Sequence, residues 1–223
     1  MKTTRRFESG FKVCLGMLGL CLALCATNVQ AGIITINGVG LGGDVPLIAN
    51  GTPENGFAGQ IFTNLNGSNI IAYCVDLFHG IGYTSYNNTT GAPSGYSNGG
   101  RAAWILENYG GNVGGNDQAT ALQLALWDVV HDGGDGLSTG TVILGGGASV
   151  TLRNAAQDII LASYGHSSSR ATILYNNDLS SGARMQTLIT YDASSPTPEP
   201  STYGMMGVGL AVIVANWKRK RAQ

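Results

Sequence analysis

Cys74 is the residue of this 223-residue chain whose chemistry most needs an explanation. The other cysteines, Cys14, Cys21 and Cys25, lie in an amino-terminal segment with the pattern of a secretory signal peptide, so its cleavage leaves Cys74 without an internal partner. An unpaired cysteine in an exported protein is explained by burial as a small hydrophobic residue, by pairing with a second chain, or by reactivity. The residue alone leaves all three explanations open.

A second motif follows downstream, in Leu122-Gln123-Leu124-Ala125-Leu126-Trp127. Together with Tyr73-Cys74-Val75-Asp76 it resembles the two hallmark motifs of bacterial thioester domains, the Tyr-Cys-x-Asp and Thr-Gln-x-Ala-Ile-Trp patterns of Gram-positive surface adhesins. Leu122 stands where that family has Thr, which loses one hydroxyl, and Leu126 stands where it has Ile. The resemblance covers residues 70–132 and implies an internal Cys74–Gln123 thioester that attaches covalently to amine- or hydroxyl-bearing targets, and so a role in adhesion.

Such a thioester would join the Cys74 sulfur to the side-chain carbonyl carbon of Gln123 and release ammonia. Holding the two groups together replaces a large entropic barrier, and an incoming amine then forms an amide and releases the thiol. Because each molecule reacts once, the chain is predicted to be a covalent binder without a cofactor, and not an enzyme. The alternative is a passive structural protein of the extracellular matrix in which Cys74 is buried or paired between chains.

Five further side chains are candidates for supporting this chemistry. Tyr73 and Trp127 would form an apolar wall that excludes water, although plain core packing explains them equally well. Asp76 follows the cysteine by two residues, so both side chains share one face of a strand, where the acid could orient the backbone or a base. His79 and His131 follow the two motifs closely, and either could accept the proton of an attacking amine near neutral pH. Each histidine taken alone is more typical of a surface or capping position.

The charge distribution excludes one class of function and favours an amine-reactive electrophile. Residues 32–193 hold four arginines, no lysine and eleven acidic residues, which leaves a net charge of −7. A nucleic-acid-binding protein needs a basic surface, so that class is excluded. An internal electrophile without neighbouring lysines cannot consume itself, and the same absence excludes a Lys–Asn isopeptide bond.

The elements that must position these residues are predicted from periodicity and turn residues. The expected fold class is α+β, a β-sandwich or barrel-like sheet with an inserted small helical subdomain. Asp117 is the candidate N-cap of the central helix. Strands are expected at 33–37, 59–64, 69–77, 141–144 and 186–192, and helices at 101–109, 117–130 and 149–164.

The segment His131-Asp132-Gly133-Gly134-Asp135-Gly136 contains the oxygen ligands of a calcium loop. It lacks the spacing and the terminal Glu of an EF-hand, so a turn rich in Asp and Gly is the favoured interpretation. No metal site is predicted.

Both ends of the chain have the composition of targeting signals. Residues 1–31 form the predicted signal peptide, and 32–193 the predicted thioester-type domain. Residues 194–202 form a Pro-rich spacer with Pro198-Glu199-Pro200, and 203–223 comprise an apolar stretch to Trp217 and a basic end. This order resembles the PEP-CTERM sorting signal of Gram-negative bacteria, with an ordinary tail anchor as the alternative. The resemblance implies export through the inner membrane, transient membrane association through 203–217, processing by an exosortase, and release to the cell surface or extracellular matrix.

Overall fold

The computed structural model describes residues 31–176 and 185–191. The predicted signal peptide up to residue 30, the Pro-rich spacer, the PEP motif and the apolar carboxy-terminal segment lie outside the described residues. No helix in the described part is long and apolar enough to cross a membrane. The described residues all belong to one compact unit.

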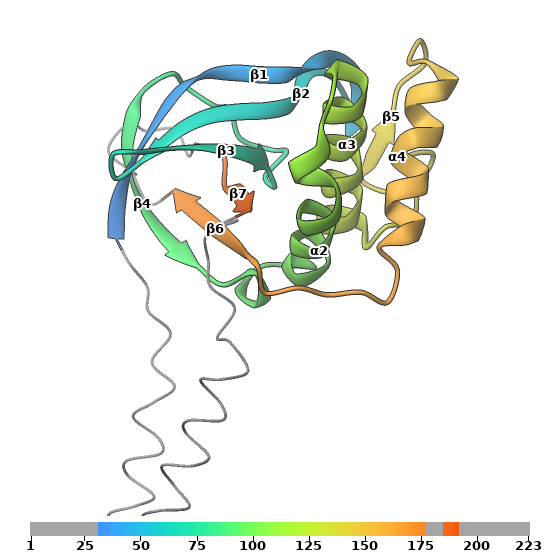
Figure 1. Cartoon of the computed structure of the whole chain (residues 1–223). Helices are drawn as coiled ribbons and strands as arrows, with labels where there is room; N and C mark the ends of the chain where they lie inside the picture. The colour runs from blue at the N-terminus through green and yellow to red at the C-terminus, as the bar shows by residue number, and fades with distance from the viewer. Residues whose placement is uncertain (1–30, 177–184, 192–223) are drawn as a thin grey trace, which may run out of the picture. The chain divides into compact units, whose positions relative to one another are not determined.

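Among the described residues, seven antiparallel strands form one sheet (Figure 1). The strand order is β2-β3-β7-β6-β4-β1-β5, and β1 also pairs with β2, so six of the strands close into a barrel-like ring. The bounds are β1 Ala31–Ala49, β2 Thr52–Leu65, β3 Ser68–Cys74, β4 Ser85–Gly91, β5 Val142–Leu144, β6 Ala171–Asn176 and β7 Leu188–Tyr191.

β1 takes part in both sides of the ring because it is long and changes register. Its first residues, Ala31–Thr35, pair with β4, and the strand pairs with β2 from Ile34 to Ala49 with two register shifts. At the second shift the two backbones approach closely: a Cβ on Gly59 of β2 would collide with the carbonyl oxygen of Leu41. Glycine is therefore required where β1 bends across β2.

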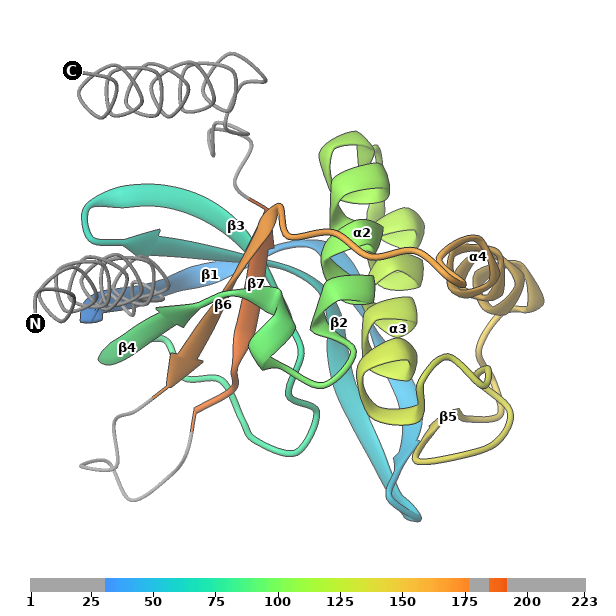
Figure 2. The same cartoon turned by 90° about the horizontal axis from the view of Figure 1, so that it is seen from below.

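Three α-helices cover one end of the sheet (Figures 1 and 2): α2 Gly99–Tyr109, α3 Asn116–Asp132 and α4 Val150–Ala162. Two short 3₁₀ turns, η2 Pro93–Gly95 and η3 Gly110–Asn112, flank α2. In both views α3 lies between the sheet and α4, and every residue from Ala119 to Val130 is buried. A helix that is covered on all sides belongs to the centre of a domain, so α3 is the element best placed to support a buried site.

The α+β class is confirmed in outline, since the structure is mostly antiparallel sheet with a few helices. The three predicted helices are present, and the five predicted strands correspond to β1, β2, β3, β5 and β7, whereas β4 and β6 were not predicted. The helices share one hydrophobic core with the sheet, so a separate inserted subdomain is not confirmed. Gly115 rather than Asp117 is the N-cap of α3, and Asp117 lies in the first turn, where its charge favours the helix dipole.

Candidate functional site

Cys74 is the last residue of β3 and is almost completely buried, with 4% of its surface exposed. It lies opposite Leu188 of β7, and the next residue, Val75, continues the pairing by donating its N–H to the carbonyl oxygen of Thr187 at 3.0 Å. Cys74 forms no disulfide among the described residues. Its position is therefore fixed by the β3–β7 pairing, which joins segments more than 100 residues apart.

The Cys74 thiol contacts the side chain of Gln186, with 2.5 Å between Sγ and Oε1. Gln186 precedes Leu188 by two residues, so it is the diagonal cross-strand neighbour of Cys74, within reach of a long side chain. The Cys74 thiol therefore donates to the Gln186 carboxamide oxygen in a short contact.

Gln123 contacts the backbone of Cys74. Its Nε2 donates to the Cys74 carbonyl oxygen at 2.7 Å, and its Oε1 accepts from the Cys74 N–H at 3.0 Å. The pairing of β2 with β3 ends at Ile61 and Ala72, and the Gln123 carboxamide supplies the donor and acceptor for Cys74 beyond that point. The structure thus places Gln123 at Cys74 through contacts with its backbone, and the carboxamide that contacts the sulfur is that of Gln186. The crosslinking role of Gln123 stays a prediction.

Gln186 was missed as a candidate because no local pattern marks it. It lies at the start of the segment predicted as a strand, in Met185-Gln186-Thr187. Gln186 could have been identified from the strand that pairs with the predicted strand at 186–192. Sequence periodicity does not reveal which strands pair. The two motifs did correctly indicate that Cys74 and Gln123 lie together.

The loop that follows Cys74 is organised by Asp76. One carboxylate oxygen, Oδ1, accepts from the Phe78 N–H at 3.1 Å, and Oδ2 lies 2.7 Å from Nδ1 of His79. Side-chain exposure is 14% for Asp76 and 35% for His79, so a proton on the histidine is accessible to solvent. The structure thus brings Asp76 and His79 together as a pair beside the end of β3.

His131 of α3 lies against the same loop. Its ring contacts Phe78 edge-on, with 5.0 Å between ring centroids. Burial lowers the pKa of His131, an effect that the charge of Asp76 partly opposes. His131 is therefore held near this loop as a largely neutral imidazole.

Burial is also the main influence on the thiol. It raises the pKa of Cys74 well above that of an ordinary cysteine, and the charge of Asp76 adds to the effect. Tyr86 of β4 has a buried hydroxyl without a hydrogen-bond partner in the described part of the chain, and burial followed by interaction with Cys74 raises its pKa too. Both groups are therefore neutral at physiological pH.

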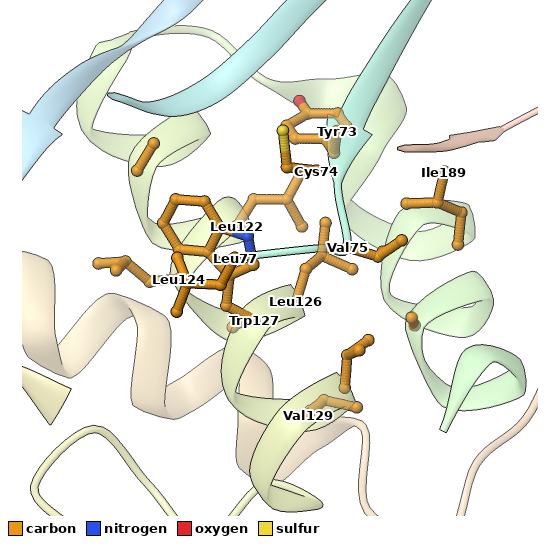
Figure 3. Packing of buried hydrophobic residues seen from close by; sticks show 14 of the residues in the cluster. Tyr73, Cys74, Val75, Leu77, Leu122, Leu124, Leu126, Trp127, Val129 and Ile189 are labelled. Carbon is orange, nitrogen blue, oxygen red and sulfur yellow. The ribbon is translucent and has the colours of Figure 1, made fainter. Parts of the chain in front are cut away.

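Tyr73 and Trp127, predicted as an apolar wall, are each 2% exposed and belong to the same core as Cys74. Figure 3 shows Tyr73 and Cys74 together at the end of β3 and Trp127 on α3 within one packed cluster. Trp127 follows Gln123 by one helical turn, so α3 presents a hydrogen-bonding residue and a large apolar side chain toward the same region. The Cys74 side of the site is consequently shielded from bulk water.

Comparison with known proteins concerns the other end of the chain. A family model of the PEP-CTERM protein-sorting motif matches residues 196–220, which include Pro198, Glu199 and Pro200. No curated protein and no solved structure matches the chain. The resemblance to thioester domains receives no support from these comparisons and stays a prediction. The motif at 196–220 identifies an exported surface or extracellular protein that is processed by an exosortase.

Proposed function

We propose that Cys74 and Gln186 form an internal thioester, through which this exported protein attaches covalently to amine- or hydroxyl-bearing targets at the cell surface or in the matrix. The observation that carries the proposal is the 2.5 Å separation of Cys74 Sγ and Gln186 Oε1. Sulfur and oxygen bonded to one carbonyl carbon lie about 2.7 Å apart, given a C=O bond of about 1.23 Å. The observed separation matches that geometry.

Formation of the bond needs only the two side chains. The sulfur attacks the side-chain carbonyl carbon of Gln186, the C–N bond breaks, and the thiol proton leaves with the amide nitrogen as ammonia. Such a reaction is slow between free molecules, and correct placement can contribute an effective molarity of about 10⁵ M or more. Gln123 bonds to the Cys74 backbone, and Gln186 lies two residues before the β3–β7 pairing, which supports the proposal because both side chains are restricted.

Attachment to a target breaks the proposed bond between Cys74 and Gln186. An incoming amine attacks the Gln186 carbonyl carbon, the C–S bond breaks, and an amide forms. Because burial disfavours the thiolate, the departing sulfur leaves as a thiol and takes up the proton that the attacking amine releases. His79, paired with Asp76, is the more exposed of the two nearby histidines and is suited to accept the proton of the amine. Each molecule reacts once, so we propose a covalent binder and not an enzyme.

The surroundings favour a long-lived thioester. Cys74 is buried among apolar side chains, which limits hydrolysis, while Gln186 is half-buried and leaves the carbonyl accessible to a target. Residues 32–193 contain no lysine, so no side-chain amine of the same domain competes with the target. We therefore expect the thioester to persist until a target amine or hydroxyl arrives.

Intact mass spectrometry of the purified protein tests the proposal. A thioester makes the chain lighter by one ammonia, and methylamine then adds at Gln186 and exposes the Cys74 thiol. Cys74→Ala and Gln186→Ala should each retain ammonia and take up no methylamine. Peptide mapping of the methylamide distinguishes Gln186 from Gln123. Equal behaviour of the wild type and both variants would overturn the proposal.

The same experiment tests the alternative of a passive matrix protein. The near-complete burial of Cys74 favours the version in which the cysteine is a core residue, because a buried thiol is inaccessible to a second chain. That alternative predicts a wild-type mass with no ammonia lost and no response to methylamine.

A further inference from the structure

Three carboxylates meet where α3 ends and the loop to β5 begins. Asp128 and Asp132 are four residues apart on one face of α3, and Asp135 follows in the loop. Each offers one oxygen, and these oxygens all lie within 4.8 Å of one another. Ionised carboxylates this close repel one another, so a bound cation would stabilise the arrangement.

Asp128 itself lacks a compensating partner. It has no exposed surface, and its Oδ1 is buried without a hydrogen-bond partner among the described residues. Its Oδ2 accepts one long hydrogen bond, from the Gly136 N–H at 3.3 Å. A buried carboxylate is normally paired, fully hydrogen-bonded or bound to a metal ion, and Asp128 meets neither of the first two conditions.

Arg101 is the cation whose charge acts on Asp128, but three of its five N–H donors bond elsewhere. Its Nε donates to the Ser163 hydroxyl, and its two terminal nitrogens donate to the carbonyl oxygens of Gly133 and Ile160. The guanidinium therefore ties the loop and α4 together without pairing directly with the carboxylate. The Asp128 oxygen without a hydrogen-bond partner points to a ligand that is not part of the protein chain.

We propose that Asp128, Asp132 and Asp135 bind one calcium ion. Calcium takes oxygen ligands at about 2.3–2.6 Å, so ligands on opposite sides of the ion lie about 4.6–5.2 Å apart. Oxygens within 4.8 Å of one another fit a shared ion of this size. The smaller magnesium ion demands a tighter octahedron and keeps much of its water, so it suits this site less well.

The loop is already shaped around these oxygens. The backbone N–H groups of Thr141 and Val142 donate to the two carboxylate oxygens of Asp132 at 2.9 and 2.7 Å, which fixes its orientation. Gly140 lies against the cluster, since a Cβ there would come within 3.0 Å of both the Asp132 and the Asp135 carboxylates. Bound calcium would pin this loop to the end of α3, the helix that carries Gln123. The proposal stands independently of the thioester.

Calorimetric titration of the purified, chelator-stripped protein with CaCl₂ tests the site, with melting temperature as a second measurement. We expect one equivalent to bind, with a dissociation constant of about 10⁻⁴–10⁻³ M as in extracellular calcium modules, and the melting temperature to rise with calcium. Asp135→Asn, an exposed position, should weaken binding about tenfold or more. Asp117→Asn, at the opposite end of the same helix, is the matched control and should bind as the wild type does.

Asp128→Asn should also lose binding, and if it fails to fold, Asp135→Asn decides the question. Absence of calcium binding by the wild type, or wild-type affinity in Asp135→Asn, would overturn the proposal. Equal stabilisation by magnesium would overturn the assignment to calcium.

Discussion

Two chemically identical carboxamides contact Cys74, and the atom that each one faces decides its role. Gln123 is 1% exposed and pairs with the backbone N–H and C=O of Cys74, whereas Gln186 contacts the sulfur. A carboxamide whose oxygen and nitrogen are both bonded to the backbone is held in place by those bonds. Gln123 is thus a positioning residue, and Gln186 is the acyl donor in the proposed reaction.

Replacement of Gln123 by Leu tests this division. It removes the partners of two buried backbone groups, each costing about 1–3 kcal/mol, so we expect the free energy of unfolding to fall by about 2–6 kcal/mol. Urea denaturation measures the loss. The folded fraction should still lose ammonia and take up methylamine at Gln186, because the reacting carboxamide is retained. Gln186→Leu is the matched control, with a smaller effect on stability and complete loss of methylamine uptake. Unchanged stability in Gln123→Leu would contradict the positioning role.

The buried thiol predicts a pH dependence of stability when the thioester cannot form. In Gln186→Ala, burial raises the folded-state pKa of Cys74, while the unfolded chain ionises near the ordinary value of about 8.5. The stabilisation is therefore fully present below that pH and is lost as the pH rises above it. Urea unfolding between pH 7 and 10 should show falling stability. Adding Cys74→Ala to this variant should make the dependence shallower, leaving the contribution of the buried tyrosines such as Tyr86. Equal slopes in the two variants would show that the thiol is not held in its neutral form.

At the scale of the elements, α3 connects the two proposed sites, and its sequence made it predictable. Its middle carries Gln123, its end carries Asp128 and Asp132, and its apolar residues follow a continuous periodic run. β4 was missed because its sequence, Ser-Tyr-Asn-Asn-Thr-Thr-Gly, is polar, although Tyr86 and Asn88 point into the core. The Cys74–Gln186 contact was beyond prediction because it depends on which distant strands pair, and local periodicity does not encode that choice.

The backbone at the end of α3 favours glycine at one position, and this preference can be tested. Gly133 is the C-cap, with a left-handed backbone at φ 70°, and its N–H bonds back to the carbonyl oxygen of Val129. No atom lies closer than 4.0 Å to the position of an added Cβ, so Gly133→Ala imposes conformational strain without a clash. We expect a loss of about 1–2 kcal/mol in the free energy of unfolding. Gly111→Ala, in open space and without a left-handed backbone, is the control and should be close to neutral. Equal effects of the two substitutions would contradict the assigned role of the cap.

At the scale of the whole molecule, amines are confined to the two ends. The four lysines are Lys2, Lys12, Lys218 and Lys220, so all of them fall in the predicted signal peptide or in the terminal part of the sorting segment. The composition therefore separates a lysine-free middle from two ends that carry the lysines. Processing at both ends would leave the new amino terminus as the single amine of the exported chain.

Counting amines on the protein recovered from the cell surface tests this organisation. An amine-reactive label should add once per chain, because cleavage near Gly32 and near the PEP motif removes all four lysines. Substitution of Glu199 by Ala within the matched motif should impair exosortase processing, leave Lys218 and Lys220 in place, and raise the count to three. Ser195→Ala, just before the matched residues, is the control and should label once. Intact mass identifies the retained segment directly. A surface-recovered wild-type chain that still carries three labelled amines would contradict carboxy-terminal cleavage, and it would place two competing amines on the same molecule as the proposed thioester.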